Sequence, residues 1–200
     1  LVGAALEAQP LTAGSLQRAL APVAGAGAAA VLHLSAHGTS DGGLILEERD
    51  RPLTAHVLSR PMLRDMLALR ARLVGAGAEG GPGAGGPRLI VLNACSAKQL
   101  GMQFVEDGIP HVVCHSTPLL DSAGQAFLRV FYSSLFQGGT VASAFDAARV
   151  AVRGDADAAV RASAENFCLL PDGLGQHGEV LFPPGEAPPA APAACPWRRA

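Results

Sequence analysis

Two short and almost entirely apolar runs stand out along the chain, and small or polar residues follow each of them. The first covers residues 30–35 (AVLHLS) and the second residues 88–93 (RLIVLN), while a shorter run lies at residues 111–114. Apolar runs of this length, bounded by turn residues, are typical of strands buried on both faces of a sheet. The pattern therefore predicts three central strands.

Elsewhere the apolar residues recur at helical spacing. A helix is predicted at residues 61–69, with proline in its first turn, and another from just after Cys95 to about Gly108. Ser122 and Gln125 form a plausible capping box for a long helix that two glycines at 138–139 end, and Thr140 is expected to cap the next helix. Weaker signals predict edge strands at 166–170 and 179–182, and a short hairpin formed by 44–47 and the segment around 52–53.

The alternation of strands and helices predicts an α/β fold, a sandwich with a mainly parallel sheet between two helical layers. Right-handed crossovers would bring the carboxyl ends of the parallel strands to one edge of that sheet. In open α/β sheets functional residues gather at this edge. The two strand ends at residues 35 and 93 are therefore the places to look for chemistry.

Composition limits the class of protein. The 200 residues suit one domain, and the formal net charge of −2 with a pI near 6.3 gives no footprint for nucleic acid. No apolar run reaches the roughly 18 residues of a membrane span, so no membrane partner is expected. Four widely spaced cysteines without a CxxC pair indicate neither a disulfide framework nor a zinc site, and favour a reducing, cytoplasmic setting.

The same features divide the chain. We predict an N-terminal piece at residues 1–27, the remainder of a preceding helix or linker, and a folded domain at residues 28–183. Residues 75–87 are so rich in glycine and proline that they predict a flexible loop, and residues 184–200 predict a disordered Pro/Ala-rich tail. The chain begins without methionine, and we expect it to be part of a longer protein.

Each of the two strand ends carries a reactive side chain. His37 follows the first strand and Cys95 the second, 58 positions later in the chain. A thiol with a pKa of about 8.5 is a weak nucleophile at neutral pH until an imidazole removes its proton. The positive end of the helix after Cys95 would favour the thiolate, and the backbone N–H groups of Gly38 and Cys95 would stabilise an oxyanion. The alternative is a buried cysteine and an unrelated strand-end histidine, and the joint occurrence of the two favours catalysis.

Several segments together resemble a known family. Residues 35–38 (SAHG) and 92–96 (LNACS), each after an apolar strand, resemble the two signatures of CHAT domains, which are caspase-like, separase-related cysteine peptidases of clan CD. Residues 108–113 (GIPHVV) resemble the next strand of that family, and the phenylalanine-rich stretch after Asp121 resembles its helices. The segment after Asn93 lacks the glycine of the caspase signature, which favours the CHAT branch.

The resemblance implies a three-layer α/β/α caspase-like fold, here without its first strands and so truncated at the N-terminus, with His37 and Cys95 as catalytic dyad. It implies cleavage of protein or peptide substrates without cofactor or metal, and further domains or an activating protein partner. By resemblance to separase-like relatives, Asp121 would line the pocket for a basic residue before the scissile bond. A helix-start aspartate that only complements the dipole is the alternative for Asp121.

Two rival functions remain open at this stage. The chain would be a non-catalytic CHAT-like interaction or signalling module if the dyad were vestigial, and retention of both His37 and Cys95 favours the enzyme. A doubly wound nucleotide-binding domain is disfavoured, because neither strand-end loop has the glycines that cradle a phosphate. His33, on the same strand face as His37, would either orient the dyad or be a hydrogen-bonded core histidine.

Overall fold

A four-stranded sheet forms the centre of the protein. The computed structural model describes residues 8–20, 31–39, 41–48, 54–75, 86–94, 97–173 and 175–184. The strands lie in the order β1 (Val31–Ser35), β5 (Leu89–Asn93), β6 (His111–His115) and β7 (Phe167–Leu170). The first three are parallel and β7 is antiparallel to β6, so the mainly parallel sheet is confirmed.

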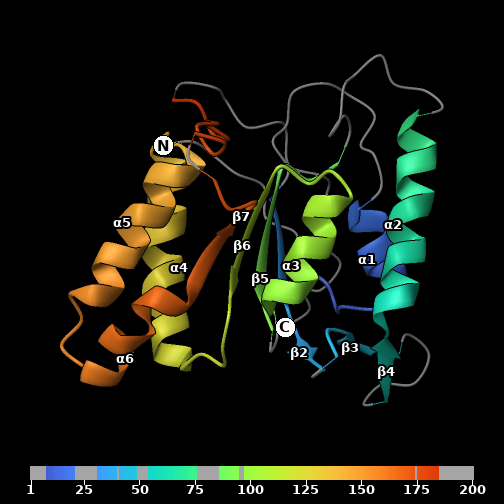
Figure 1. Ribbon diagram of the computed structural model, residues 1–200, viewed down its shortest axis with the longest axis horizontal. Coiled ribbons are helices and arrows are strands. Elements are labelled where there is room, and N and C mark those ends of the chain that lie inside the picture. The colour runs from blue at the N-terminus through green and yellow to red at the C-terminus, as the bar shows by residue number, and fades with distance from the viewer. Residues whose placement is uncertain are drawn as a thin grey trace, which may run out of the picture.

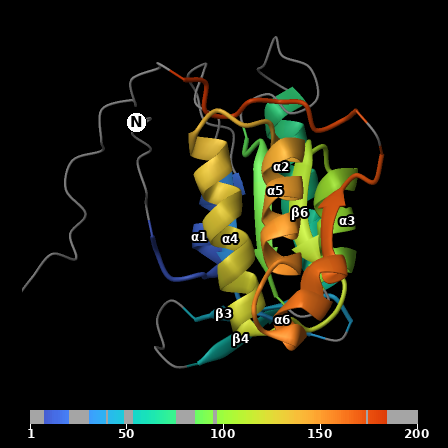
Figure 2. The same cartoon turned by 90° about the vertical axis from the view of Figure 1, so that its left-hand side faces the viewer.

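Helices cover both faces of this sheet, which makes the fold a three-layer α/β/α sandwich (Figures 1 and 2). One layer holds α4 (Asp121–Phe136) and α5 (Val141–Arg153), packed against each other. The opposite layer holds α1 (Ala13–Leu20), α2 (Arg60–Gly75) and α3 (Ala97–Glu106). A short helix α6 (Ala158–Ala162) and the 3₁₀ turn η1 (Ser163–Asn166) lead from α5 into β7.

The apolar runs form strands because both faces of the sheet are covered. Along β5, Leu89 and Val91 pack into the core with α4 and α5, while Ile90 and Leu92 pack into the core with α1, α2 and α3. Side chains alternate between the two faces of a strand, so a strand between two helical layers needs apolar residues at every position. Leu16 and Leu20 of α1 join the second of these cores.

A second, smaller sheet lies beside the carboxyl edge of the main one. It consists of β2 (His37–Gly38), β3 (Leu44–Glu47) and β4 (Ala55–Leu58), all antiparallel. The predicted hairpin is confirmed, but its second strand is at residues 55–58, and residues 51–53 lie outside the described part of the chain. The chain thus leaves the main sheet at Ala36 and enters this small sheet one residue later.

The helix boundaries correct one prediction and confirm two. The capping box at Ser122 and Gln125 is wrong: the N-cap lies two residues earlier, at Leu120, which makes no side-chain cap. Gly138, with φ of +85°, ends that helix in a conformation that favours glycine. The side chain of Thr140 accepts a hydrogen bond from the Ser143 N–H (3.1 Å) and caps α5 as expected.

Other predictions concern segments at the ends and in the loops. Within the described residues, the strand predicted at 179–182 is only a single bridge between Thr140 and Val180. Most of the predicted loop at 75–87 and nearly all of the predicted tail at 184–200 lie outside the described residues. The domain boundaries at residues 28 and 183 stay predictions. No helix in the described part of the chain is long and apolar enough to cross a membrane.

The amino edge of the sheet is closed by a cluster of charged and imidazole side chains. Arg88 makes a two-bond contact with Glu179 (2.9 and 2.8 Å), and the same carboxylate accepts from Nε2 of His111 (2.8 Å). The Nδ1 atoms of His111 and His177 lie 2.8 Å apart, and His177 Nε2 lies 3.0 Å from the Pro171 carbonyl oxygen. The cluster ties the segment at residues 175–184 to the start of β5 and β6.

These contacts determine which groups donate. Glu179 and Pro171 both accept, so Nε2 of His111 and Nε2 of His177 are the donors in these two contacts. Burial lowers the pKa of His111, and the nearby His177 and Arg88 act in the same direction, while the hydrogen bond to the Glu179 carboxylate acts against them. The Arg88 guanidinium and then His111 hold the pKa of Glu179 below its ordinary value, although partial burial acts against them.

Candidate active site

The register of β1 and β5 determines what meets at the carboxyl edge. Ser35 is the register partner of Asn93, and the Ala36 N–H still donates to the Asn93 carbonyl (3.1 Å). His37 and Cys95 each follow one of these partners by two residues. The parallel pairing therefore brings His37 and the residues directly before Cys95 to the same edge of the sheet.

A cleft of about 720 Å³ opens at this edge. Its lining comes from the ends of β1, β5 and β6, from the small sheet of β2, β3 and β4, and from the segment before α1. The loop from β6 into α4 completes the lining. The lining residues of the described chain are Leu11, Ser35, Ala36, His37, Ile45, Leu46, Glu47, Thr54, Ala55, Asn93, Ala94, His115, Pro118, Leu119 and Asp121.

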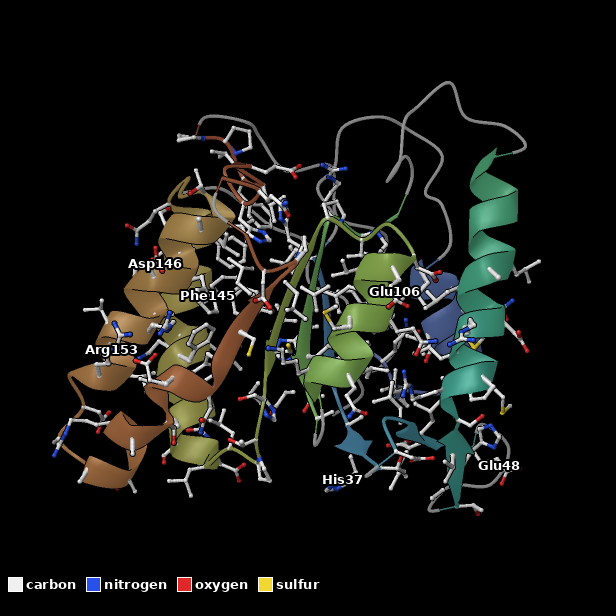
Figure 3. All side chains as sticks on the ribbon, viewed as in Figure 1. His37, Glu48, Glu106, Phe145, Asp146 and Arg153 are labelled. Atoms are coloured by element: carbon white, nitrogen blue, oxygen red, sulfur yellow. The ribbon has the colours of Figure 1, made fainter. Side chains whose placement is uncertain are left out.

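His37 lies in β2, at the end of the sandwich where the small sheet begins (Figure 3). Its side chain is exposed and lines the cleft. Its backbone pairs with Ile45 of β3, so the small sheet holds the residue in place while the ring stays open to solvent. Among the described residues we find no hydrogen-bond partner for the ring, so its nitrogen atoms are available for proton transfer.

Cys95 lies outside the described residues, and so does Ser96. The residues on either side are described. Asn93 and Ala94 line the cleft, and α3 begins at Ala97, two residues after the cysteine. A helix start leaves backbone N–H groups without helical partners and carries a partial positive charge, which favours a thiolate close by. The predicted helix after the cysteine is thus confirmed.

Gly38, the other half of the predicted oxyanion hole, lies next to a tightly bonded turn. The Thr39 N–H donates to the Gly43 carbonyl (3.0 Å), and the Gly43 N–H donates back to the Thr39 hydroxyl (2.8 Å). Antiparallel pairs alternate between hydrogen-bonded and non-hydrogen-bonded, so Gly38 and Leu44 form a non-hydrogen-bonded pair. The Gly38 N–H is therefore directed away from β3.

Asp121 occupies the first turn of α4, is exposed, and lines the same cleft. Its position agrees with both interpretations of Asp121. An acid in the first turn of a helix complements the helix dipole, and the same side chain can also line a pocket. Glu47 of β3 lines the cleft as well, and the described lining contains no lysine or arginine. Two carboxylates without a basic residue favour a positively charged ligand group.

His115 is a cleft residue that the sequence did not identify as part of the site. It ends β6, is 5% exposed, and its Nδ1 lies 2.7 Å from the Thr117 carbonyl oxygen. Nδ1 therefore donates, and Nε2 has no partner among the described residues. Its position at the carboxyl end of the third parallel strand was the signal that could have found it.

Among the described residues, His33 forms no hydrogen bond with His37. Its Nδ1 is 2.8 Å from the hydroxyl of Tyr132, and the two rings stack. The hydrogen bond agrees with the alternative prediction for His33, that of a hydrogen-bonded core histidine. Its side chain is exposed, however, so His33 packs on α4 at the surface and is not a core residue.

The fold is a three-layer α/β/α sandwich with a cleft at the carboxyl edge of its parallel strands. The chain belongs to the CHAT domain family, a caspase-like clan CD family, because the family's model matches residues 4–179. A search among curated proteins found no significant match.

Proposed function

We propose that the chain is a cysteine endopeptidase that cleaves protein substrates through His37 and Cys95, after a basic residue. The observation that carries the proposal is the shared edge of the sheet. The exposed ring of His37 lines the same cleft as Ala94, the residue directly before Cys95. Membership of a caspase-like family supports the same chemistry.

The residues would divide the reaction as follows. His37 takes the Cys95 proton, and the sulfur attacks the scissile carbonyl carbon, forming a C–S bond while the carbonyl oxygen becomes an oxyanion. The Gly38 and Cys95 N–H groups stabilise this oxyanion. His37 then protonates the leaving amine as the C–N bond breaks. Water, deprotonated by His37, hydrolyses the thioester and releases the acid product.

The acidic lining supports the preference for a basic residue. Asp121 and Glu47 line the cleft, and no lysine or arginine does so within the described chain. A substrate Arg or Lys side chain would place its charge near these carboxylates, whereas an acidic side chain would be repelled. Both groups are in contact with solvent, so the discrimination expected from each is modest.

Active-site labelling tests the dyad. The complete protein is incubated with acyloxymethyl-ketone probes that carry Arg, Lys, Asp or Leu before the reactive group. We expect labelling by the Arg and Lys probes, complete loss in Cys95→Ala, and strong loss in His37→Ala. Cys195→Ala is the matched thiol control, and His56→Ala, an exposed histidine of β4 outside the cleft lining, is the matched imidazole control. Both controls should label like the wild type.

The same experiment can reject the proposal. If the Cys95→Ala variant is still labelled, another residue is the nucleophile and the assignment of Cys95 is wrong. Absence of labelling by all four probes in the folded, complete protein would instead favour a non-catalytic CHAT module that acts through protein–protein interaction.

A further inference from the structure

Two cysteines face each other across the boundary between β6 and β7. Cys114 and Cys168 are register partners in this antiparallel pair, and both are free thiols. Directly opposed residues in an antiparallel pair point to the same face of the sheet. Here that face is the one covered by α3, because Val112 and Leu170, two residues along the strands, pack there too.

The spacing of this pair suits a covalent bond between the sulfur atoms. The Ser116 N–H donates to the Asn166 carbonyl (2.8 Å), so the pair two residues along, Cys114 and Cys168, is also a hydrogen-bonded one. Opposed Cα atoms at such positions are about 5.5 Å apart. Disulfides span Cα separations of about 4.4–6.8 Å, so the strands need no large movement to accept one.

The two thiols differ in access. Cys114 is 1% exposed and is covered by α3 at Gly101, where an added Cβ would lie 3.3 Å from the Cys114 sulfur. Cys168 is only half-buried, and its sulfur lies 3.6 Å from the Asn166 carbonyl oxygen. Cys168 is therefore the more accessible residue of the pair.

The two thiols also differ in pKa, because of the hydrogen bonds and charges around them. A hydrogen bond from the Cys114 thiol lowers the pKa of Cys168 to about 6, and Lys98 and the Ser116 hydroxyl act in the same direction, against partial burial and Asp172. The same hydrogen bond, together with burial, raises the pKa of Cys114. Lys98 lies in the first turn of α3 and is held 3.8 Å from Asp172. These effects favour the thiolate at Cys168, the more accessible residue of the pair.

We propose that Cys114 and Cys168 form a site of reversible oxidation by hydroperoxides, with Cys168 as the reacting thiolate and Cys114 as the resolving thiol. The Cys168 sulfur attacks the terminal peroxide oxygen: the S–O bond forms, the O–O bond breaks, and the alkoxide or hydroxide leaves and takes up a proton. Cys168 is oxidised to a sulfenic acid and the peroxide is reduced to an alcohol or water.

The second step closes the bridge. The Cys114 sulfur attacks the Cys168 sulfur, the S–S bond forms as the S–O bond breaks, and the Cys114 proton leaves with the hydroxyl group as water. A dithiol reductant returns both residues to thiols. A metal site is disfavoured here, because no three His, Cys, Asp or Glu side chains of the described chain are grouped to hold an ion. The proposal does not depend on peptidase activity.

The first test counts thiols in the full chain with Cys95→Ala and Cys195→Ala, which leaves only the proposed pair. After hydrogen peroxide and alkylation, we expect the two free thiols to disappear together and to return with dithiothreitol. Mass spectrometry should find the peptide with Cys114 linked to the peptide with Cys168. Two free thiols after excess peroxide, in folded protein, would overturn the proposal, and so would a disulfide only between chains.

The second test assigns the two roles. In the Cys114→Ala variant, a dimedone probe should trap sulfenic acid at Cys168, because no resolving thiol remains. In Cys168→Ser, dimedone should leave Cys114 unlabelled. Comparable labelling of both would overturn the assignment of roles.

A third measurement leaves both Cys114 and Cys168 unchanged. In the double variant that retains the pair, iodoacetamide at pH 7 should alkylate Cys168 at least about tenfold faster than Cys114, because the thiolate is the reacting form. Lys98→Gln should slow Cys168 severalfold by removing a positive charge, whereas Arg64→Gln, in α2, should not. Equal rates at the two cysteines, or no effect of Lys98→Gln, would contradict the proposed activation.

Discussion

Strand β6 has a histidine at each end, and the two ends of the sheet use the same residue types differently. At the amino edge, His111 is bonded through both nitrogens, and Glu179 and Arg88 complete a closed cluster. At the carboxyl edge, His115 has one bond, and His37 has no partner among the described residues. Imidazole and carboxylate groups fasten the chain at one edge and remain available for chemistry at the other.

The difference teaches how to separate a structural cluster from a candidate site in one molecule. Buried polar groups that satisfy each other increase stability and have no capacity left for a ligand. Groups that remain without partners beside a cleft contribute little to stability and can bind or transfer protons. Substitutions at the two edges should therefore have opposite profiles of stability and activity.

The largest effect is expected for His37→Ala. Loss of the general base should reduce kcat/KM by about 10²–10⁴-fold in the active protein. The free energy of unfolding should stay within about 0.5 kcal/mol of the wild type, because the side chain is exposed. Peptide-substrate kinetics and urea unfolding measure the two quantities. A variant that is destabilised as much as it is inactivated would remove the contrast between the edges.

Glu179→Gln should show the reverse profile. The amide cannot replace the charge that binds Arg88 and His111, so we expect a loss of about 2–3 kcal/mol in stability. Activity at saturating substrate should change less than twofold while the protein is folded. Glu47→Gln, at the open edge, is the matched control and should be nearly neutral in urea unfolding. Equal effects of the two substitutions would show that the amino-edge cluster does not stabilise the fold.

The pH dependence of stability sharpens the same comparison. Arg88 and His111 lower the pKa of Glu179 in the folded state, so the unfolded chain binds this proton first as the pH falls. The stability from Glu179 is fully present above its unfolded pKa of about 4.5 and is lost as the pH falls through the lower folded value. Glu179→Gln should therefore flatten the decline below pH 4.5, measured by thermal unfolding. An unchanged slope would contradict this assignment.

Asp121→Asn should have the smallest effect. The folded protein should keep its stability, and the preference for Arg over Leu probes should fall roughly five- to tenfold, which corresponds to about 1 kcal/mol for a partly solvated charge pair. A variant with an unchanged Arg preference would leave Asp121 with only its role at the start of α4. Glu47→Gln reports whether the second carboxylate contributes to the same preference.

The sequence was sufficient to predict the central strands, the layers and the edge that carries the cleft. Residues such as Leu89 to Leu92 are apolar on both faces, and that pattern has few explanations other than a covered sheet. The end of α4 at Gly138 and the Thr140 cap were also predictable, because they depend on local backbone preferences. The position of His37 at a strand end identified it as a candidate, and the family resemblance supported that prediction.

What could not be predicted depends on long-range contacts. Glu179 and His111 lie 68 positions apart, and nothing near either residue indicates that they meet. The pairing of Cys114 with Cys168 requires the register of β7, which the sequence predicted only as a weak edge strand. The cap predicted at Ser122 was wrong because α4 already begins at Asp121, which places Ser122 inside its first turn.

The order in which strands join the sheet has a consequence for how the protein folds. β5, α3 and β6 form one local unit within residues 89–115, whereas β1 pairs with β5 across 58 positions. Closing the longer loop costs more chain entropy, so the local unit should form first and open last. Asn93 and Ala94, directly before Cys95, belong to that unit, whereas His37 follows β1. Hydrogen exchange should therefore be slower in β5 and β6 than in β1. A partly opened protein would keep the β5–β6 unit folded while His37, the proposed base, is displaced with β1.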